Sequence, residues 1–242
     1  MKHCGFAVIM VIAVVTLFIC LGCATLSTGQ KVKQSRAHYQ LGVSYLNDNN
    51  IQPAFVEFQK ALELNPNDKE VLNAIGVLYL LKLEDYPQAI GYFQRALKID
   101  KDYSEAANNL GRTYEKLGRF QDAIESYKIA ISNPLYQNAH KAFASLGMAY
   151  YRIKNYQAAM DAFKDSIRRF SDFSYPYYGL ALVYNATGKY TDAAMTLQKA
   201  LELDPEFQGD REKARKYLDE RKVVVKGDEE RDVEDLLEIM NY

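Results

Sequence analysis

A block of about 34 residues recurs five times in tandem, and this recurrence constrains the fold more than any other feature of the chain. In each copy a large aliphatic residue, a small residue and a tyrosine stand at i, i+1 and i+4. A second trio, small, large and small, follows at i, i+4 and i+7. Each spacing marks one face of a helix. Two such helices cannot bury their apolar faces alone, so we expect the copies to stack into a solenoid.

The two trios can be followed through all five copies. They are Leu41, Gly42, Tyr45, Ala54, Phe58 and Ala61; Ile75, Gly76, Tyr79, Ala89, Phe93 and Ala96; Leu110, Gly111, Tyr114, Ala123, Tyr127 and Ala130; Leu146, Gly147, Tyr150, Ala159, Phe163 and Ser166; Leu180, Ala181, Tyr184, Ala193, Leu197 and Ala200. The small residues let helices approach closely, and the large ones fill the space between them. All six prolines fall in first helical turns or between repeats, where proline is tolerated. In copy three the pattern predicts helices over about 105–117 and 121–131.

This pattern closely resembles the tetratricopeptide repeat over residues 35–207. The resemblance implies an all-α, right-handed superhelical solenoid of about five repeats, at 35–68, 69–103, 104–139, 140–173 and 174–207. Copy two has one extra residue in its Leu83-Glu84-Asp85-Tyr86 turn. Copy three ends irregularly at residues 132–137.

Two segments follow the repeats. Residues 208–225 read as a polar helix that caps the last repeat. The tail, 226–242, is acidic but carries an apolar stripe, namely Val233, Leu236, Leu237 and Met240. Three interpretations of this tail stay open: a disordered segment, a docking helix for a partner, or a ligand for the chain's own groove.

Composition and motifs indicate a scaffold, not an enzyme. The net charge is only −1, which gives no general electrostatic case for nucleic acid. We find no metal-ligand cluster, phosphate-binding loop or nucleophile–base pair, so we expect no catalytic residues, no metal and no cofactor. The three cysteines, Cys4, Cys20 and Cys23, all precede the repeats.

The N-terminus carries the pattern of an export signal. Lys2 and His3 precede an apolar run that ends before Gly22-Cys23-Ala24. The segment resembles the bacterial lipoprotein signal, which implies a signal peptide at 1–22, a lipidated Cys23 and a tether at 23–34. It also implies the periplasmic face of the outer membrane. An uncleaved inner-membrane anchor is the alternative.

In tetratricopeptide solenoids the first helix of each repeat lines the concave groove, where we expect a protein partner to bind. Carried onto this chain, the groove positions are Tyr39, Val43, Leu46, Asn73, Val77, Leu80, Leu81, Asn108, Arg112, Glu115, Ala144, Met148, Tyr151, Arg152, Tyr175, Tyr178 and Leu182. This surface is largely apolar and aromatic, which is typical of binding sites. Alternatively, several of these residues pack inward or are covered by the C-terminal segment.

A lipid-anchored chain of such repeats resembles the type IV pilus biogenesis and stability lipoproteins. The cue is the irregular Asn133-Pro134-Leu135-Tyr136 junction. The resemblance implies a pilotin, which binds the secretin subunit and aids its localisation and assembly. The alternative is an envelope adaptor that scaffolds peptidoglycan hydrolases or proteases, or an assembly factor anchored in the inner membrane.

Overall fold

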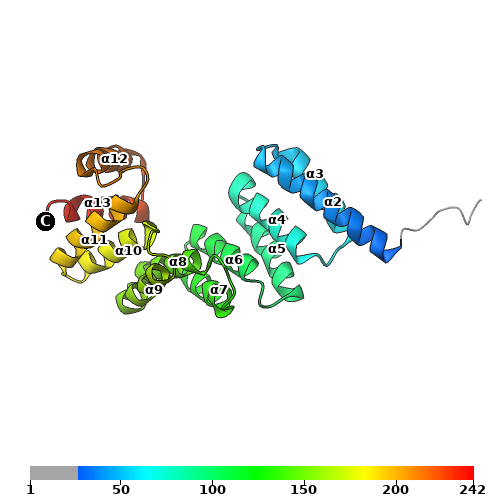
Figure 1. Cartoon of the computed structure of the whole chain (residues 1–242), viewed down its shortest axis with the longest axis horizontal. Coiled ribbons are helices and arrows are strands. Elements are labelled where there is room, and N and C mark those ends of the chain that lie inside the picture. The colour runs from blue at the N-terminus through cyan, green and yellow to red at the C-terminus, as the bar shows by residue number, and fades with distance from the viewer. Residues whose placement is uncertain (1–26) are drawn as a thin grey trace, which may run out of the picture. The chain divides into compact units, whose positions relative to one another are not determined.

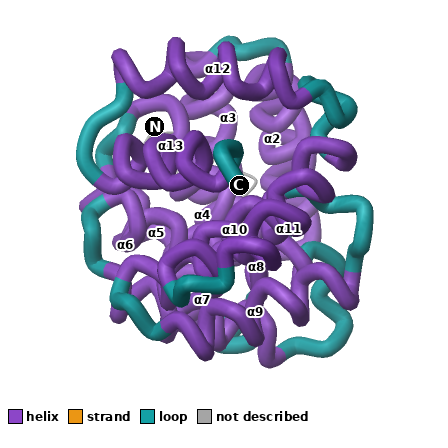
Figure 2. The backbone as a smooth tube through the Cα atoms, turned by 90° about the vertical axis from the view of Figure 1, so that its left-hand side faces the viewer, coloured by secondary structure: helices purple, strands orange, loops and turns teal. Residues whose placement is uncertain are grey.

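The computed structural model describes residues 27–242, and their regular structure is helical, with twelve α-helices, one π-helical turn and no strand. Figures 1 and 2 show these helices joined by short connections. The expected signal peptide at 1–22, Cys23 and the first residues of the tether lie outside this range. None of the described helices combines the length and the apolar character needed to cross a membrane.

The described part of the first compact unit is a single helix pair, α2 (Thr28–Asn47) and α3 (Ile51–Leu64). α2 begins seven residues before the first expected repeat, so residues 28–34 are helical, not an irregular tether. A capping box starts the helix: the Gln30 amide donates to Ser27 Oγ at 3.3 Å, and the Ser27 amide donates to Gln30 Oε1 at 3.0 Å. Residues 28–34 are all exposed, which explains why their sequence lacks apolar periodicity.

The second compact unit, residues 67–242, carries the other four copies as helix pairs. These helices are α4 (Lys69–Leu78) and α5 (Tyr86–Ile99), α6 (Ser104–Lys116) and α7 (Phe120–Ser132), α8 (Ala139–Arg152) and α9 (Tyr156–Arg169), and α10 (Tyr175–Ala186) and α11 (Tyr190–Leu203). The fold is thus an all-α solenoid of about five tetratricopeptide-like repeats, as the sequence predicts.

A glycine–aromatic contact explains why the repeat needs both residue types. A Cβ atom added at Gly111 would lie 2.6 Å from the Tyr127 ring of the paired helix. The corresponding glycines of copies one, two and four meet a phenylalanine ring at the same 2.6 Å. In copy five, Ala181 stands at the glycine position and Leu197 at the aromatic position. The small residue is therefore larger, and the large residue smaller, than in the other copies. The summed volume of the two side chains therefore changes little from copy to copy.

The two irregular places of the sequence have distinct structural causes. The extra residue of copy two is absorbed by a π-helical turn, Tyr79–Leu83, which ends at Glu84 with φ 52°. In the irregular end of copy three, Tyr136 is buried and packs against the small residues Ala107 and Ala142. Its neighbour Leu135 is 85% exposed.

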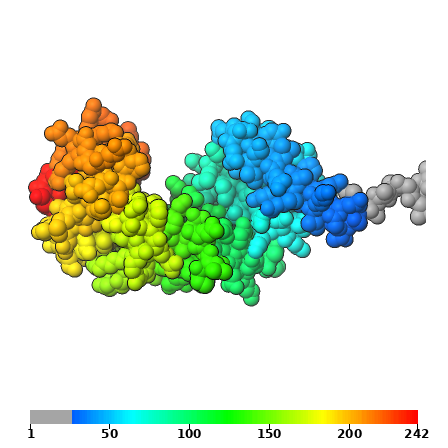
Figure 3. Space-filling model, viewed as in Figure 1, coloured from blue at the N-terminus to red at the C-terminus, as the bar shows by residue number. Residues whose placement is uncertain are grey.

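Two further helices, α12 (Arg211–Val224) and α13 (Asp228–Ile239), follow the repeats. α12 contributes Ala214 and Leu218 to a shared core, whereas α13 packs directly on α10 and α11. Figures 1 and 2 show α13 running between α12 and the last repeat, and in Figure 3 the red C-terminal residues abut the orange and yellow ones. Of the three interpretations of the acidic tail, the structure shows the third, a segment that folds onto the chain's own groove helices.

Candidate partner-binding groove

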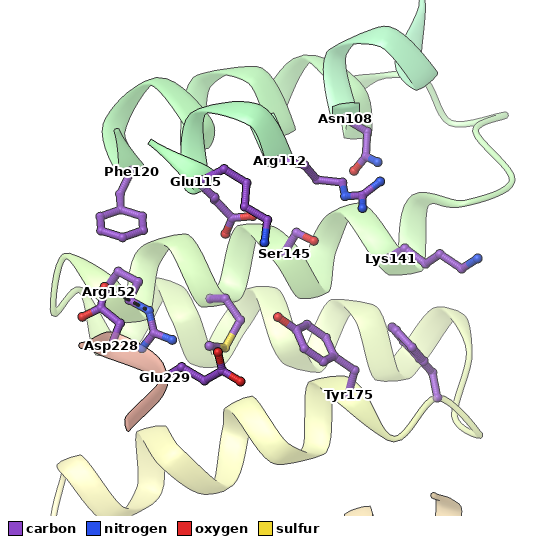
Figure 4. Close-up of a pocket in the computed structure, with 13 residues that line it drawn as sticks. Asn108, Arg112, Glu115, Phe120, Lys141, Ser145, Arg152, Tyr175, Asp228 and Glu229 are labelled. Carbon is purple, nitrogen blue, oxygen red and sulfur yellow. Dashed lines mark ion pairs between the residues drawn. The ribbon is translucent and has the colours of Figure 1, made fainter. Parts of the chain in front are cut away.

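A cleft of about 660 Å³ opens between α6, α8 and α10, the first helices of copies three to five. It is lined by Asn108, Arg112, Glu115, Lys116, Phe120, Lys141, Ser145, Met148, Arg152, Phe173, Tyr175, Asp228 and Glu229. Figure 4 shows Asn108 and Arg112 of α6 on one side, Tyr175 of α10 on the other, and Ser145 of α8 between them. The start of α13, with Asp228, closes one end. We call this site the cleft.

The wall on α6 presents amide and guanidinium groups. Asn109 donates from Nδ2 to Asn73 Oδ1 on α4 at 3.1 Å, and Arg112 Nη1 reaches Asn109 Oδ1 at 3.5 Å. Asn108 differs from these residues because its buried Oδ1 has no hydrogen-bond partner among the described residues. A buried acceptor without a donor costs free energy. To accept a hydrogen bond from an N–H group of a ligand, the Asn108 amide must turn so that its buried Oδ1 faces the cleft.

The unpaired charges of the cleft are positive. Arg112, Lys116 and Lys141 form no ion pair in the part of the chain that the structure describes, and Arg112 and Lys141 are exposed. Two acidic residues at the start of α13 line the cleft, and both already take part in ion pairs. Glu229 pairs with Arg221, and Asp228 pairs with Arg231 and lies 3.8 Å from Arg152 Nε. The cleft therefore suits an acidic ligand.

Glu115 is the one acidic residue that α6 contributes to the lining of the cleft. Burial raises the pKa of its carboxyl group to about 7, although the Tyr127 hydroxyl group donates a hydrogen bond to it and Arg152 and Arg112 act in the opposite direction. The carboxyl group is therefore partly protonated near neutral pH. It cancels less of the positive charge of Arg112 and Lys116 than a fully ionised glutamate would.

Beyond the cleft, α13 covers the last part of the groove helices. Asp232 receives two hydrogen bonds from Arg152, one of them 2.7 Å from Nη1 to Oδ1, and Tyr151 donates to Asp235 at 3.3 Å. Leu182 is buried together with Leu236 in the core beneath α13. For this part of the groove the structure agrees with the alternative interpretation, in which the C-terminal segment covers the groove residues.

Apart from Leu80 and Ala144, the predicted groove residues of the second unit divide into three groups. Asn108, Arg112, Glu115, Met148, Arg152 and Tyr175 line the cleft. Tyr151, Tyr178 and Leu182 lie under α13. Asn73 and Val77 on α4 are half-buried, and Leu81 is exposed.

The structure corrects the predicted exposure of two groove residues. Leu80 is only 3% exposed, and Ala144 is fully buried. Leu80 lies in the π-helical turn, which changes the direction of its side chain relative to a regular α-helix, so the sequence spacing misplaces it. Ala144 has too small a side chain to reach past its packed neighbours.

In the first unit, Tyr39, Val43 and Leu46 are half-buried on α2. The Tyr39 ring lies 6.0 Å from the Phe58 ring, centroid to centroid, and the Arg36 guanidinium group lies 4.9 Å from the centroid of Tyr39. These contacts give Tyr39 a packing role within its own helix pair.

Sequence reasoning missed Lys141, Ser145 and the α13 carboxylates. Lys141 stands one turn before the recurring positions of α8, where the repeat pattern carries no signal. The i, i+4, i+7 spacing of Asp228, Asp232 and Asp235 places them on one helical face, but it does not indicate which surface that face meets.

Family models of the tetratricopeptide repeat match the chain repeatedly. One matches residues 35–68, a second 57–91, and a third 76–140, 108–172 and 145–206. Together these matches extend from residue 35 to residue 206. The chain belongs to the tetratricopeptide-repeat family.

Among individual relatives, the type IV pilus assembly protein PilF of Pseudomonas aeruginosa is 27% identical over 154 residues, which cover 61% of each protein. Superkiller protein 3 of Schizosaccharomyces pombe is 25% identical over 202 residues, 80% of this chain but 14% of that protein. The chain thus spans less than two thirds of the length of either relative.

Solved structures of two pilus proteins share the fold. The match to the PilF structure, 24% identical with a TM-score of 0.65, covers 83% of this chain and 96% of the chain in that structure. PilW, described as a widely conserved type IV pilus biogenesis factor, is 20% identical with a TM-score of 0.65, covering 82% of this chain and 97% of PilW. This tetratricopeptide-repeat protein therefore resembles the PilF and PilW pilus factors.

The family is generally one of non-enzymatic scaffolds that bind protein partners. Within residues 27–242, no three histidine, cysteine, aspartate or glutamate side chains are grouped so that they could hold a metal ion.

Proposed function

We propose that this protein is a membrane-anchored scaffold of the bacterial envelope that assists type IV pilus biogenesis. It binds a secretin subunit through the cleft and helps to localise and assemble the secretin. The likeness to PilF and PilW supports the pilus assignment. The observation that carries the binding role is the cleft itself, with three unpaired positive side chains beside the unsatisfied Asn108 Oδ1.

The cleft fits an acidic segment of the partner. Carboxylates of the partner pair with Arg112, Lys116 and Lys141, while a backbone N–H group donates to Asn108 Oδ1. Met148 and Tyr175 supply apolar surface next to these polar groups. Such a ligand satisfies a buried acceptor and neutralises three like charges at once.

Charge reversal in the cleft tests this role. We expect Arg112→Glu with Lys141→Glu to reduce capture of the secretin subunit at least ~10-fold, because exposed like charges then repel the ligand. The matched control is Lys98→Glu with Lys164→Glu, two exposed lysines on the second helices of their repeats. Equal capture by both double variants, with melting curves like the wild type, would remove the cleft from the binding site. Secretin multimers and pili that persist after deletion of the gene would refute the pilus role.

We also propose that Cys23 carries the lipid that anchors the protein at the periplasmic face of the outer membrane. This part rests on the sequence signal alone. Palmitate labelling should be lost in Cys23→Ser, with accumulation of the precursor. A wild-type protein that takes up no palmitate would instead have an uncleaved anchor.

A further inference from the structure

The contact between α13 and the repeats has the chemistry of a ligand in a binding site. The Arg152 guanidinium group binds both carboxylate oxygens of Asp232, and both side chains are only 15% exposed. A paired, two-pronged contact of this kind gives orientation as well as affinity. Tyr151 adds a second polar anchor through Asp235, one turn further along α13.

Below these anchors, α13 presents an apolar stripe to the repeats. Val233, Leu236, Ile239 and Met240 are buried at i, i+3, i+6 and i+7, in one core with Leu182 and Leu197. The other faces of α13 are strongly acidic. The helix, Asp228–Ile239, contains seven acidic residues and one basic residue, Arg231, so its net charge is −6. The repeats therefore hold an acidic amphipathic helix, one of the recurring ligand types of helical grooves.

The fit of α13 is incomplete. A second cleft of about 270 Å³ opens to solvent beside it, lined by Tyr178, Leu182, Leu218 and Leu236 among others. Burial also raises the pKa of the Asp235 carboxyl group, and the neighbouring Asp232 adds to the rise, so the charged carboxylate is held at a cost.

α12, which links the last repeat to α13, buries few of its side chains. α12 buries only Ala214 and Leu218, and its last residues, Val223 and Val224, are 78% and 69% exposed. Two ion pairs join α12 to α13, Arg221–Glu229 and Lys222–Glu234, and all four side chains are exposed. Exposed ion pairs contribute little. At the other end of α13, Arg211 and Arg215 of α12 donate to the Met240 carbonyl oxygen at 2.8 and 3.0 Å, so displacement of α13 breaks contacts with α12 as well as contacts with the repeats.

The cleft and the surface beneath α13 are continuous. Asp228 and Glu229, at the start of α13, line the cleft, and Arg152 takes part in both sites. A partner segment that enters the cleft and continues along the groove helices therefore meets α13 at Arg152.

We propose that the surface formed by α8, α10 and α11 is a binding site for an acidic amphipathic helix, with α13 as its resident ligand. A partner helix with a carboxylate for Arg152 and an apolar i, i+3, i+7 stripe takes the place of α13. The chain is then self-occupied until a partner of this chemistry arrives. The inference extends the proposed function. It rests on that function only for the identity of the protein that carries the competing helix.

A variant of the full chain with a released α13 tests the proposal. Asp232→Arg with Leu236→Asp alters α13 and leaves Tyr151, Arg152, Tyr178 and Leu182 intact. The probe is a fluorescein-labelled peptide with the native sequence of residues 227–242, measured by anisotropy on chains purified in detergent micelles. We expect the peptide to bind the release variant at least ~10-fold more tightly than the wild type, because a tethered ligand competes at millimolar effective concentration.

Three controls make the result specific. Adding Arg152→Glu to the release variant should abolish peptide binding. The Lys222→Ala variant loses only the exposed ion pair between Lys222 and Glu234. It should bind the peptide as weakly as the wild type does. A peptide that itself carries Asp232→Arg and Leu236→Asp should not bind.

Several outcomes would overturn the proposal. Equal, weak peptide binding by the release variant and the wild type is one. Loss of amide protection throughout α10 and α11 in the release variant is another, because α13 would then be a permanent cap. A wild-type dimer in which each copy binds α13 of the other copy is a third, because α13 would then not be a ligand of its own chain. The peptide derives from this chain, so its failure to bind would not contradict capture of the secretin subunit. Loss of secretin capture would likewise not contradict binding of the peptide.

Discussion

At the scale of residues, the fold depends on pairs of side chains whose volumes are matched. Gly111 leaves room for the Tyr127 ring, which is fully buried, and Ala181 faces the smaller Leu197. Because neighbouring helices touch at these pairs, a single methyl group at the glycine forces the ring or a helix to move.

We therefore expect Gly111→Ala to lower the free energy of unfolding by about 1–3 kcal/mol, which chemical denaturation can measure. The matched control is Gly91→Ala on α5, where an added Cβ meets nothing within 4 Å. That change should raise stability by roughly 0.5–1 kcal/mol, because alanine is the better helix former. Equal losses from both substitutions would argue against the glycine–aromatic contact.

Glu115 makes stability depend on pH. Its pKa is about 7 in the folded chain against 4.5 for the free group, so the folded state binds more protons between these values. Stability from this group is complete below about pH 4.5 and is lost as pH rises through 7. We expect Glu115→Gln to remove this decline, a difference on the order of 2–3 kcal/mol between pH 5 and pH 8. Identical pH profiles of the variant and the wild type would contradict the shifted pKa.

At the scale of elements, the first turns of α2 depend on their cap. Residues 28–34 are exposed, so the Ser27–Gln30 capping box is the main local stabiliser that the structure provides there. Most helices gain stability from packing, and this stretch has none to gain.

We expect Ser27→Ala to cost about 1 kcal/mol locally and to speed amide exchange of residues 31–34 roughly five-fold. Residues of α3 should be unaffected. Lys33→Ala, at an exposed position within the helix, is the control and should leave exchange unchanged or slower. If exchange at residues 31–34 did not respond to the loss of Ser27, packing rather than capping would hold this stretch.

The elements differ in how well the sequence predicts them. In copy three the predicted helices, 105–117 and 121–131, fall within one residue of Ser104–Lys116 and Phe120–Ser132, because periodicity and turn residues act locally. The place of α13 was not predictable. Asp232 and Arg152 are 80 positions apart, and an apolar stripe does not specify the surface that it covers. Leu80 was misplaced for a local reason, since spacing rules assume a regular helix and it lies in a π-helical turn.

At the scale of the whole molecule, the formal net charge of −1 hides a separation of charge. α13 has a net charge of −6, so the other residues sum to about +5. Part of this excess lines the cleft as Arg112, Lys116 and Lys141. Self-occupation by α13 and capture of an acidic partner both follow from this distribution.

The central claim is that the cleft is where the partner binds, and site-specific photocrosslinking tests it most directly. A photoreactive residue at Lys141, exposed at the cleft, is compared in cells with one at Lys164, exposed on the second helix of the same repeat. We predict an adduct with the secretin subunit from position 141 and none from position 164. An adduct from position 164 alone would place the binding surface on the opposite side of the repeat and contradict the claim.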